Sequence, residues 1–129
     1  MRTPKQLYPN ERVIYHPEIS TCIYCEESIA KYNYLAWDKT IQTLEGAMSI
    51  ASRPGHCRKA ECPGYTMRLL SAQGEQMSPR GNSYGYDVIV RIGWQRQEFR
   101  RTYAEIHQEI SGEVQISLSE VSYLYQQVY

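Results

Sequence analysis

The pattern of apolar and polar residues between positions 32 and 52 predicts two β-strands joined by a tight turn. The first stretch is rich in residues that favour strands, namely Tyr32, Tyr34, Trp37, Thr40, Ile41 and Thr43. Glu45-Gly46 then forms a turn, after which Met48 and Ile50 alternate with small residues in the two-residue period of a strand. A further short strand is predicted at residues 12–15.

After residue 85 the apolar spacing changes to that of an amphipathic helix. Four apolar residues fit one face of a first helix, with Trp94 nearby: Val88, Ile89, Ile92 and Phe99. The ends of this helix suit the helix dipole, because Asp87 lies in the first turn and three basic residues lie in the last turn: Arg96, Arg100 and Arg101.

Two capping-box patterns predict where two further helices begin. Thr102 with Glu105 opens a second helix, and Ser117 with Glu120 opens a third. The apolar positions of the second helix, which ends at Ser111-Gly112, are Tyr103, Ile106 and Ile110. The predicted buried stripe of the third helix is Leu118, Val121, Leu124, Tyr125 and Val128. The connection between them contains Val114 and Ile116, which are predicted to form a short packed segment.

The cysteines lie in two close pairs, Cys22 with Cys25 and Cys57 with Cys62, on either side of an insert at positions 26–56. A structural zinc ion takes four such thiolates, and a tight turn supplies two of them at once. The predicted strands of the insert return the second pair to the first. We therefore predict one structural Zn²⁺ per chain, held by all four cysteines in a small zinc ribbon.

The same cysteine pattern also fits chemical states other than zinc ligation. Two disulfides would form in a secreted protein, although no apolar run follows Met1 as a signal peptide requires. Free thiols are a further alternative, and the four-residue spacing of the second pair departs from the usual two. His16 and His56 lie close enough in sequence to replace a cysteine, but we predict both to be loop residues.

Residues 71–85 contain three glycines and a proline without periodicity, which predicts a boundary between two modules. The predicted fold class is α+β: an N-terminal arm and zinc ribbon at 1–70, a linker at 71–85, and a three-helix helix-turn-helix module at 86–129. A small ribbon has little core of its own, so a bound metal would matter to its folding.

Composition limits the possible functions. The chain of 129 residues has a formal net charge of zero, which argues against a strongly basic nucleic-acid binder. No apolar run approaches the length of a membrane span, so no membrane association is expected. Neither a serine–histidine motif nor an acidic cluster suggests catalysis, and we predict that the protein is not an enzyme. The chain has twelve tyrosines and one phenylalanine, and tyrosine suits half-buried positions in thin domains.

Three short helices in this order are typical of a helix-turn-helix, which places its last helix in the DNA major groove. The polar face of the third helix supplies candidate base contacts: Ser117, Ser119, Ser122, Tyr123 and Gln126. The candidate phosphate contacts are Arg58, Lys59, Arg100 and Arg101. A generic helical bundle with a solvated polar face is the alternative.

The order of these parts resembles the N-terminal DNA-binding region of bacterial insertion-sequence transposases of the ISL3 type. The resemblance covers roughly residues 20–129 and is carried by the cysteine pairs, by Trp37-Asp38-Lys39-Thr40-Ile41-Gln42-Thr43-Leu44-Glu45-Gly46, and by the helices. Glu26 stands where a glycine commonly follows the first pair. The catalytic carboxylates of such enzymes have no counterpart here, which implies a fragment of a longer protein or a small product that kept the DNA-binding half.

The resemblance implies a sequence-specific module for double-stranded DNA in the bacterial cytoplasm, associated with the nucleoid, and it allows a homodimer. The alternative function is a zinc ribbon that binds a protein partner. Duplex binding should weaken steeply with salt, whereas a protein interface need not.

Overall fold

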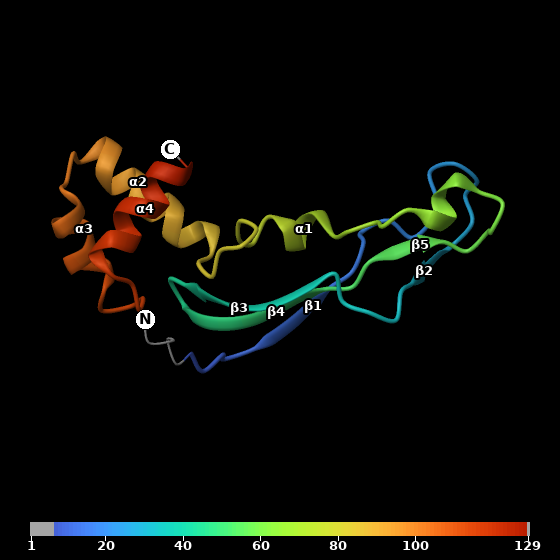
Figure 1. Ribbon diagram of the computed structural model, residues 1–129, viewed down its shortest axis with the longest axis horizontal. Helices are drawn as coiled ribbons and strands as arrows, with labels where there is room; N and C mark the ends of the chain where they lie inside the picture. The colour runs from blue at the N-terminus through green and yellow to red at the C-terminus, as the bar shows by residue number, and fades with distance from the viewer. Residues whose placement is uncertain (1–6, 129) are drawn as a thin grey trace. The chain divides into compact units, whose positions relative to one another are not determined.

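The structure is a computed structural model that describes residues 7–128, and it has a mixed α+β architecture. The strands are β1 (Arg12–Tyr15), β2 (Ile29–Lys31), β3 (Trp37–Thr43), β4 (Gly46–Ser52) and β5 (Gly55–Cys57). The helices are the 3-10 helix η1 (Pro63–Thr66) and the α-helices α1 (Ala72–Glu75), α2 (Tyr86–Glu98), α3 (Tyr103–Ile110) and α4 (Leu118–Val128) (Figure 1). No helix in this part of the chain is long and apolar enough to cross a membrane.

The chain divides into two compact units, which are described separately. The helical unit consists of Met1–Glu11, Thr40–Met48 and Ser78–Tyr129, and the cysteine unit consists of Arg12–Lys39 and Ser49–Met77. The division after Met77 falls inside the predicted linker 71–85. The turn of the β3–β4 hairpin, which was assigned to the ribbon from sequence, groups instead with the helices.

The predicted hairpin and the predicted strand at residues 12–15 are confirmed. β1 pairs in parallel with β4 in register Arg12↔Ser49 to Tyr15↔Ser52, and the sheet order is β1-β4-β3. The predicted alternation along β4 is wrong at its end, because Ile50 and Ala51 are both fully buried. Successive residues of a strand point to opposite faces, so this central strand is covered on both faces there.

Side chains from α2, α3 and α4 build the core of the helical unit. Its buried members are Tyr84, Val88, Ile89, Ile92, Ile106, Ile110, Val114, Ile116, Val121 and Leu124. The predicted packed segment between α3 and α4 is therefore confirmed. Both capping boxes are also present: Glu105 and Glu120 each donate a backbone N–H at 3.2 Å to the hydroxyl of Thr102 or Ser117, and each carboxylate accepts the reciprocal N–H at 3.0 Å.

Two apolar residues assigned to the core from sequence lie outside it. Phe99 is 52% exposed and follows α2, and Leu118 is 47% exposed at the start of α4. The arginines predicted for the last turn of α2 are also misplaced in part, because the helix ends at Glu98 and Arg100 has a left-handed φ of 51°. A left-handed residue just beyond the last turn is a common helix stop. The predicted contribution of Val128 to the stripe lies outside the described side chains.

The turn of the β3–β4 hairpin belongs to the helical unit because Gln42 is hydrogen-bonded into it. Its backbone N–H donates to the Ser83 carbonyl at 2.9 Å, and its carbonyl accepts from Gly85 at 2.8 Å. Its side-chain amide exchanges two further bonds with the Gln115 backbone, at 2.7 and 2.8 Å. Leu44 packs against the helical core at the end of the same strand.

Hydrogen bonds of Ser71 hold the start of the predicted linker. Ser71 is buried and caps α1, since its hydroxyl accepts from the Gly74 N–H at 3.0 Å. The same hydroxyl donates to the Glu18 carboxylate at 3.0 Å. The first residues of this segment, which lacks apolar periodicity, are therefore held by polar contacts.

Candidate metal centre

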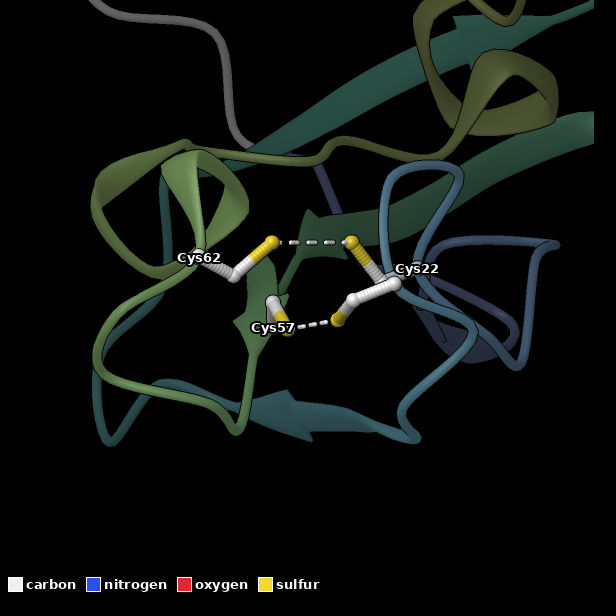
Figure 2. Close-up of side chains that lie close together, drawn as sticks. Cys22, Cys57 and Cys62 are labelled. Atoms are coloured by element: carbon white, nitrogen blue, oxygen red, sulfur yellow. Dashed lines mark hydrogen bonds between the residues drawn. The ribbon is translucent and has the colours of Figure 1, made fainter.

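The four cysteines converge on one point of the cysteine unit, as the sequence predicts. Their sulfur atoms all lie within 4.8 Å of one another. The Sγ atoms of Cys22 and Cys62 are 3.7 Å apart, and those of Cys25 and Cys57 are 3.4 Å apart. Figure 2 shows the side chains of Cys22, Cys57 and Cys62 turned toward the shared centre. These separations exceed the length of the S–S bond in a disulfide, and none of the four cysteines is disulfide-bonded.

Two short strands and two turns bring the pairs together. β2 pairs antiparallel with β5, which places Ile29 opposite Cys57. The turn of the first pair is closed by the Glu26 N–H, which donates to the Cys22 carbonyl at 2.9 Å. The second pair spans the loop between β5 and η1, so that Cys62 directly precedes the 3-10 helix.

Backbone amides point at the sulfur atoms in a repeated pattern. The N–H of Tyr24 donates to the Cys22 sulfur and the N–H of Lys59 donates to the Cys57 sulfur, each at 3.4 Å. In both cases the donor lies two residues after the cysteine. Hydrogen bonds of this kind stabilise thiolate over thiol and orient a metal ligand.

The thiols of the cluster differ in acidity. The Tyr24 amide lowers the pKa of Cys22 to about 7, whereas burial raises the pKa of Cys57 to about 12. Four thiolates this close would repel one another in the absence of a cation. A bound divalent ion offsets this repulsion and favours the thiolate form, because coordination deprotonates a thiol outright. The donor set therefore fits a metal ion that prefers sulfur.

Gly64 allows the backbone to approach the cluster. A Cβ at this position would lie 3.0 Å from the Cys22 sulfur and 3.1 Å from Cβ of Cys57. The sequence indicates only a turn at Cys62-Pro63-Gly64, so its contact with the sulfur atoms is a feature that sequence reasoning missed. A glycine directly after a Cys-Pro step is the signal that points to it.

Glu26 occupies a backbone conformation that suits glycine. Its φ is 64°, in the left-handed region that costs most residues roughly 1 kcal/mol or more. Glu26→Gly is therefore expected to stabilise the metal-bound cysteine unit by about 0.5–1 kcal/mol, measured by denaturant unfolding with metal present. Glu27→Gly, a matched change next to it, should not stabilise the unit. A loss of stability in Glu26→Gly would show that the carboxylate outweighs the backbone strain.

Neither His16 nor His56 belongs to the group of converging ligand atoms. The ring of His56 lies between two tyrosine rings, with centroids 4.5 Å from Tyr32 and 5.2 Å from Tyr65. The Nδ1 atom of His16 is buried and has no hydrogen-bond partner among the described residues. The four cysteines are thus the candidate ligand set.

The predicted DNA-contacting residues fall into separate places. Arg58 and Lys59 are exposed on the loop of the second cysteine pair. On α4 and at its N-terminus, Ser117 is a capping residue, Ser122 is half-buried, and the others of the set are exposed: Ser119, Tyr123 and Gln126. The structure therefore brings the α4 residues together on one helix.

Glu109 engages two of the four arginines on and just after α2, Arg91 and Arg101. Its carboxylate accepts from Arg91 at 3.0 Å and from Gln95 at 2.9 Å, and it forms a close ion pair with Arg101. Arg100 is exposed and forms no such pair within the described chain. The sequence does not reveal this arrangement, because Glu109 lies on a different helix from the residues it binds.

Comparison of the chain with models of protein families, with curated proteins and with solved structures finds no match. The resemblance to insertion-sequence transposases therefore stays a prediction.

Proposed function

We propose that this chain is a sequence-specific module for double-stranded DNA that contains one structural zinc ion. Four cysteines with converging sulfur atoms support the choice of zinc, which is commonly held by four thiolates in structural sites. A site with four protein ligands leaves no open position for substrate, which favours a structural over a catalytic ion.

The observation that carries DNA binding is the exposed face of α4. The helix begins with a complete capping box, and its buried side is anchored by Val121 and Leu124. The exposed side carries uncharged hydrogen-bonding groups within about two turns of the start, the region where a recognition helix contacts base edges. Gln126 is the residue best suited to pair with adenine.

Phosphate contacts would come from exposed arginines and lysines. Arg100 is the stronger candidate of its pair, because the guanidinium of Arg101 is already paired with Glu109. Arg58 and Lys59 offer exposed positive charge beside the cysteine cluster. The resemblance to transposases extends the proposal to a transposase or a transposase-derived protein that acts on bacterial DNA.

Selection from a random duplex pool at low salt, with zinc present, tests this function. We expect an enriched sequence, and Gln126→Ala should lose about 1–3 kcal/mol of discrimination at one base position. Arg100→Ala should weaken binding to every sequence alike and reduce the salt slope by about one. Gln108→Ala, an exposed glutamine on α3, is the matched control. If no sequence were enriched, the proposal of sequence-specific DNA binding would be wrong.

A protein-binding module is the second candidate, favoured by apolar residues exposed on and just after α2. Tyr86, Val90 and Trp94 recur at four-residue spacing and are 37%, 55% and 47% exposed. Phe99 packs its ring edge-on against Trp94, with centroids 4.7 Å apart. Such a stripe is a feature of helices that bind a partner, including a second copy. An interaction that withstands high salt would favour this function over duplex binding.

A further inference from the structure

A hollow of about 420 Å³ lies between the segment that precedes α2 and the first two turns of α4. Residues 81–84 form one wall, and Ser119, Glu120 and Tyr123 from α4 form the other. Both walls belong to the helical unit. Pockets that bind small molecules have volumes of about 300–1,000 Å³, so this hollow is large enough to hold a small planar ring.

The wall at residues 81–84 is fixed by hydrogen bonds to its backbone. The buried Ser78 hydroxyl donates to the Tyr84 carbonyl at 2.6 Å, and the Asn82 side chain accepts from the Tyr84 N–H at 2.8 Å. Tyr84 is itself a member of the buried core. A wall that is already ordered loses little conformational entropy when a ligand binds, which favours binding in the hollow.

The carboxylate of Glu120 gives the hollow its chemical character. It accepts from the Tyr84 hydroxyl at 2.5 Å and from the Ser117 N–H at 3.0 Å, which hold it at the junction of the two walls. A carboxylate has about four lone-pair positions and accepts several donors at once. Among the described residues that line the hollow, Glu120 alone carries a charge at neutral pH. The hollow therefore attracts an N–H donor and repels a phosphate.

Tyr123 and Ser119 suit a ligand with a planar ring. Tyr123 is 59% exposed, so much of its ring is open for stacking. Ser119 lies one turn before it and has an exposed hydroxyl, which shares a 3.1 Å hydrogen bond with the hydroxyl of Ser117. Ring surface next to a carboxylate matches a base with an exocyclic amino group, since the amino group of cytosine is a donor that Glu accepts.

We propose that this hollow binds an amino-bearing nucleobase, cytosine or adenine, whose exocyclic N–H donates to Glu120 and whose ring lies against Tyr123. The base comes either from a free nucleotide or from DNA held by α4. In the second case the inference rests on the duplex function proposed above, which shares Ser119 and Tyr123 with the hollow, and it adds a preference for an amino base.

Nuclear magnetic resonance titration of the isotope-labelled, zinc-loaded full chain with nucleosides tests the proposal. The probes are cytidine and adenosine, each compared with its deamino analogue, which carries hydrogen in place of the amino group. The amino nucleosides should bind with a Kd of about 1 mM and shift the amide signals of residues 81–84 and 119–124. The analogues should bind about 10- to 150-fold more weakly, because they lose a hydrogen bond to a charged acceptor.

Glu120→Gln separates the proposed contact from the fold. Glutamine also completes a capping box, so α4 should keep its circular dichroism, but its neutral amide should lose the preference for amino nucleosides. Glu105→Gln makes the same change in the capping box of α3, outside the hollow, and is the matched control. Tyr123→Ala should weaken binding about 5- to 150-fold, because stacking is lost, and Tyr123→Phe should recover most of that loss.

Duplex selection with Glu120→Gln distinguishes the two sources of the base. If DNA supplies it, the variant should lose a preference for cytosine or adenine at one position of the enriched sequence. If a free nucleotide is the ligand, the enriched sequence should not change. A chain that enriches no duplex but binds amino nucleosides would support the hollow and contradict the duplex function. The proposal is overturned if about 10 mM nucleoside shifts no signal of the hollow, or if Glu120→Gln and Tyr123→Ala bind like the parent.

Discussion

Replacing Cys57 with serine is expected to abolish metal binding and to unfold the cysteine unit while α2, α3 and α4 remain folded. Cys57 is fully buried and its sulfur lies 3.4 Å from that of Cys25, so its loss opens the centre of the ligand set. Structural zinc contributes roughly 10–16 kcal/mol of apparent binding free energy in small domains, far more than a unit of this size retains without metal.

Elemental analysis and residue-resolved hydrogen exchange measure the two parts of this result. The parent should contain about one zinc per chain and the variant almost none. Amides of β2 and β5 should lose protection in the variant or after chelation, whereas those of the helices keep it, because the helical unit has its own buried core. Ala60→Ser adds a hydroxyl on the exposed loop between Cys57 and Cys62 and should retain metal.

Two outcomes would contradict the expectation. Zinc retained at parent level in Cys57→Ser would show that three cysteines and another ligand suffice. A single cooperative loss of all structure on chelation would show that the two units fold as one.

Replacing Gln42 with alanine is expected to destabilise the helical unit by about 1–3 kcal/mol, although Gln42 lies on a strand. The change removes two hydrogen bonds to the Gln115 backbone, at 2.7 and 2.8 Å. Gln42 is only 4% exposed, and its loss leaves the Gln115 N–H without this partner, whereas the Gln115 carbonyl keeps a hydrogen bond from the Tyr84 hydroxyl at 3.2 Å. An unpaired buried backbone group costs roughly 1–3 kcal/mol.

Thermal or urea unfolding followed by helical circular dichroism measures the effect of Gln42→Ala. Glu45→Ala, at the exposed turn of the same hairpin, should change stability by less than about 0.5 kcal/mol. If Gln42→Ala matched this control, the hairpin turn would not contribute to the stability of the helices.

Local chemistry explains which parts of the structure could be predicted from sequence. The cysteine cluster follows from two close pairs separated by strands, and the capping boxes follow from residues three positions apart. Spacing alone could not separate buried from exposed apolar residues. Phe99 and Leu118 were therefore wrongly assigned to the core, since each has helical spacing but lies near a helix end.

The features that could not be predicted from the sequence depend on contacts between residues far apart in the chain. Gln42 and Gln115 are 73 positions apart, and nothing in the strand pattern identifies a glutamine as a link to the helices. The same holds for Glu109, which binds Arg101, a residue that the sequence offers as a phosphate contact. The rings of Tyr32, His56 and Tyr65 are a further case, because they come from three segments that the β2–β5 pairing and η1 bring together.

The parallel pairing of β1 with β4 has a consequence for synthesis on the ribosome. The first cysteine pair lies between these strands, and Cys22 is 40 positions ahead of Cys62. At about 5–20 residues per second, the first two thiols emerge roughly 2–8 s before the last one. During that interval the nascent chain presents two of the four ligands to the cellular thiol pool, and the set is complete only after β4, β5 and Cys62 have emerged.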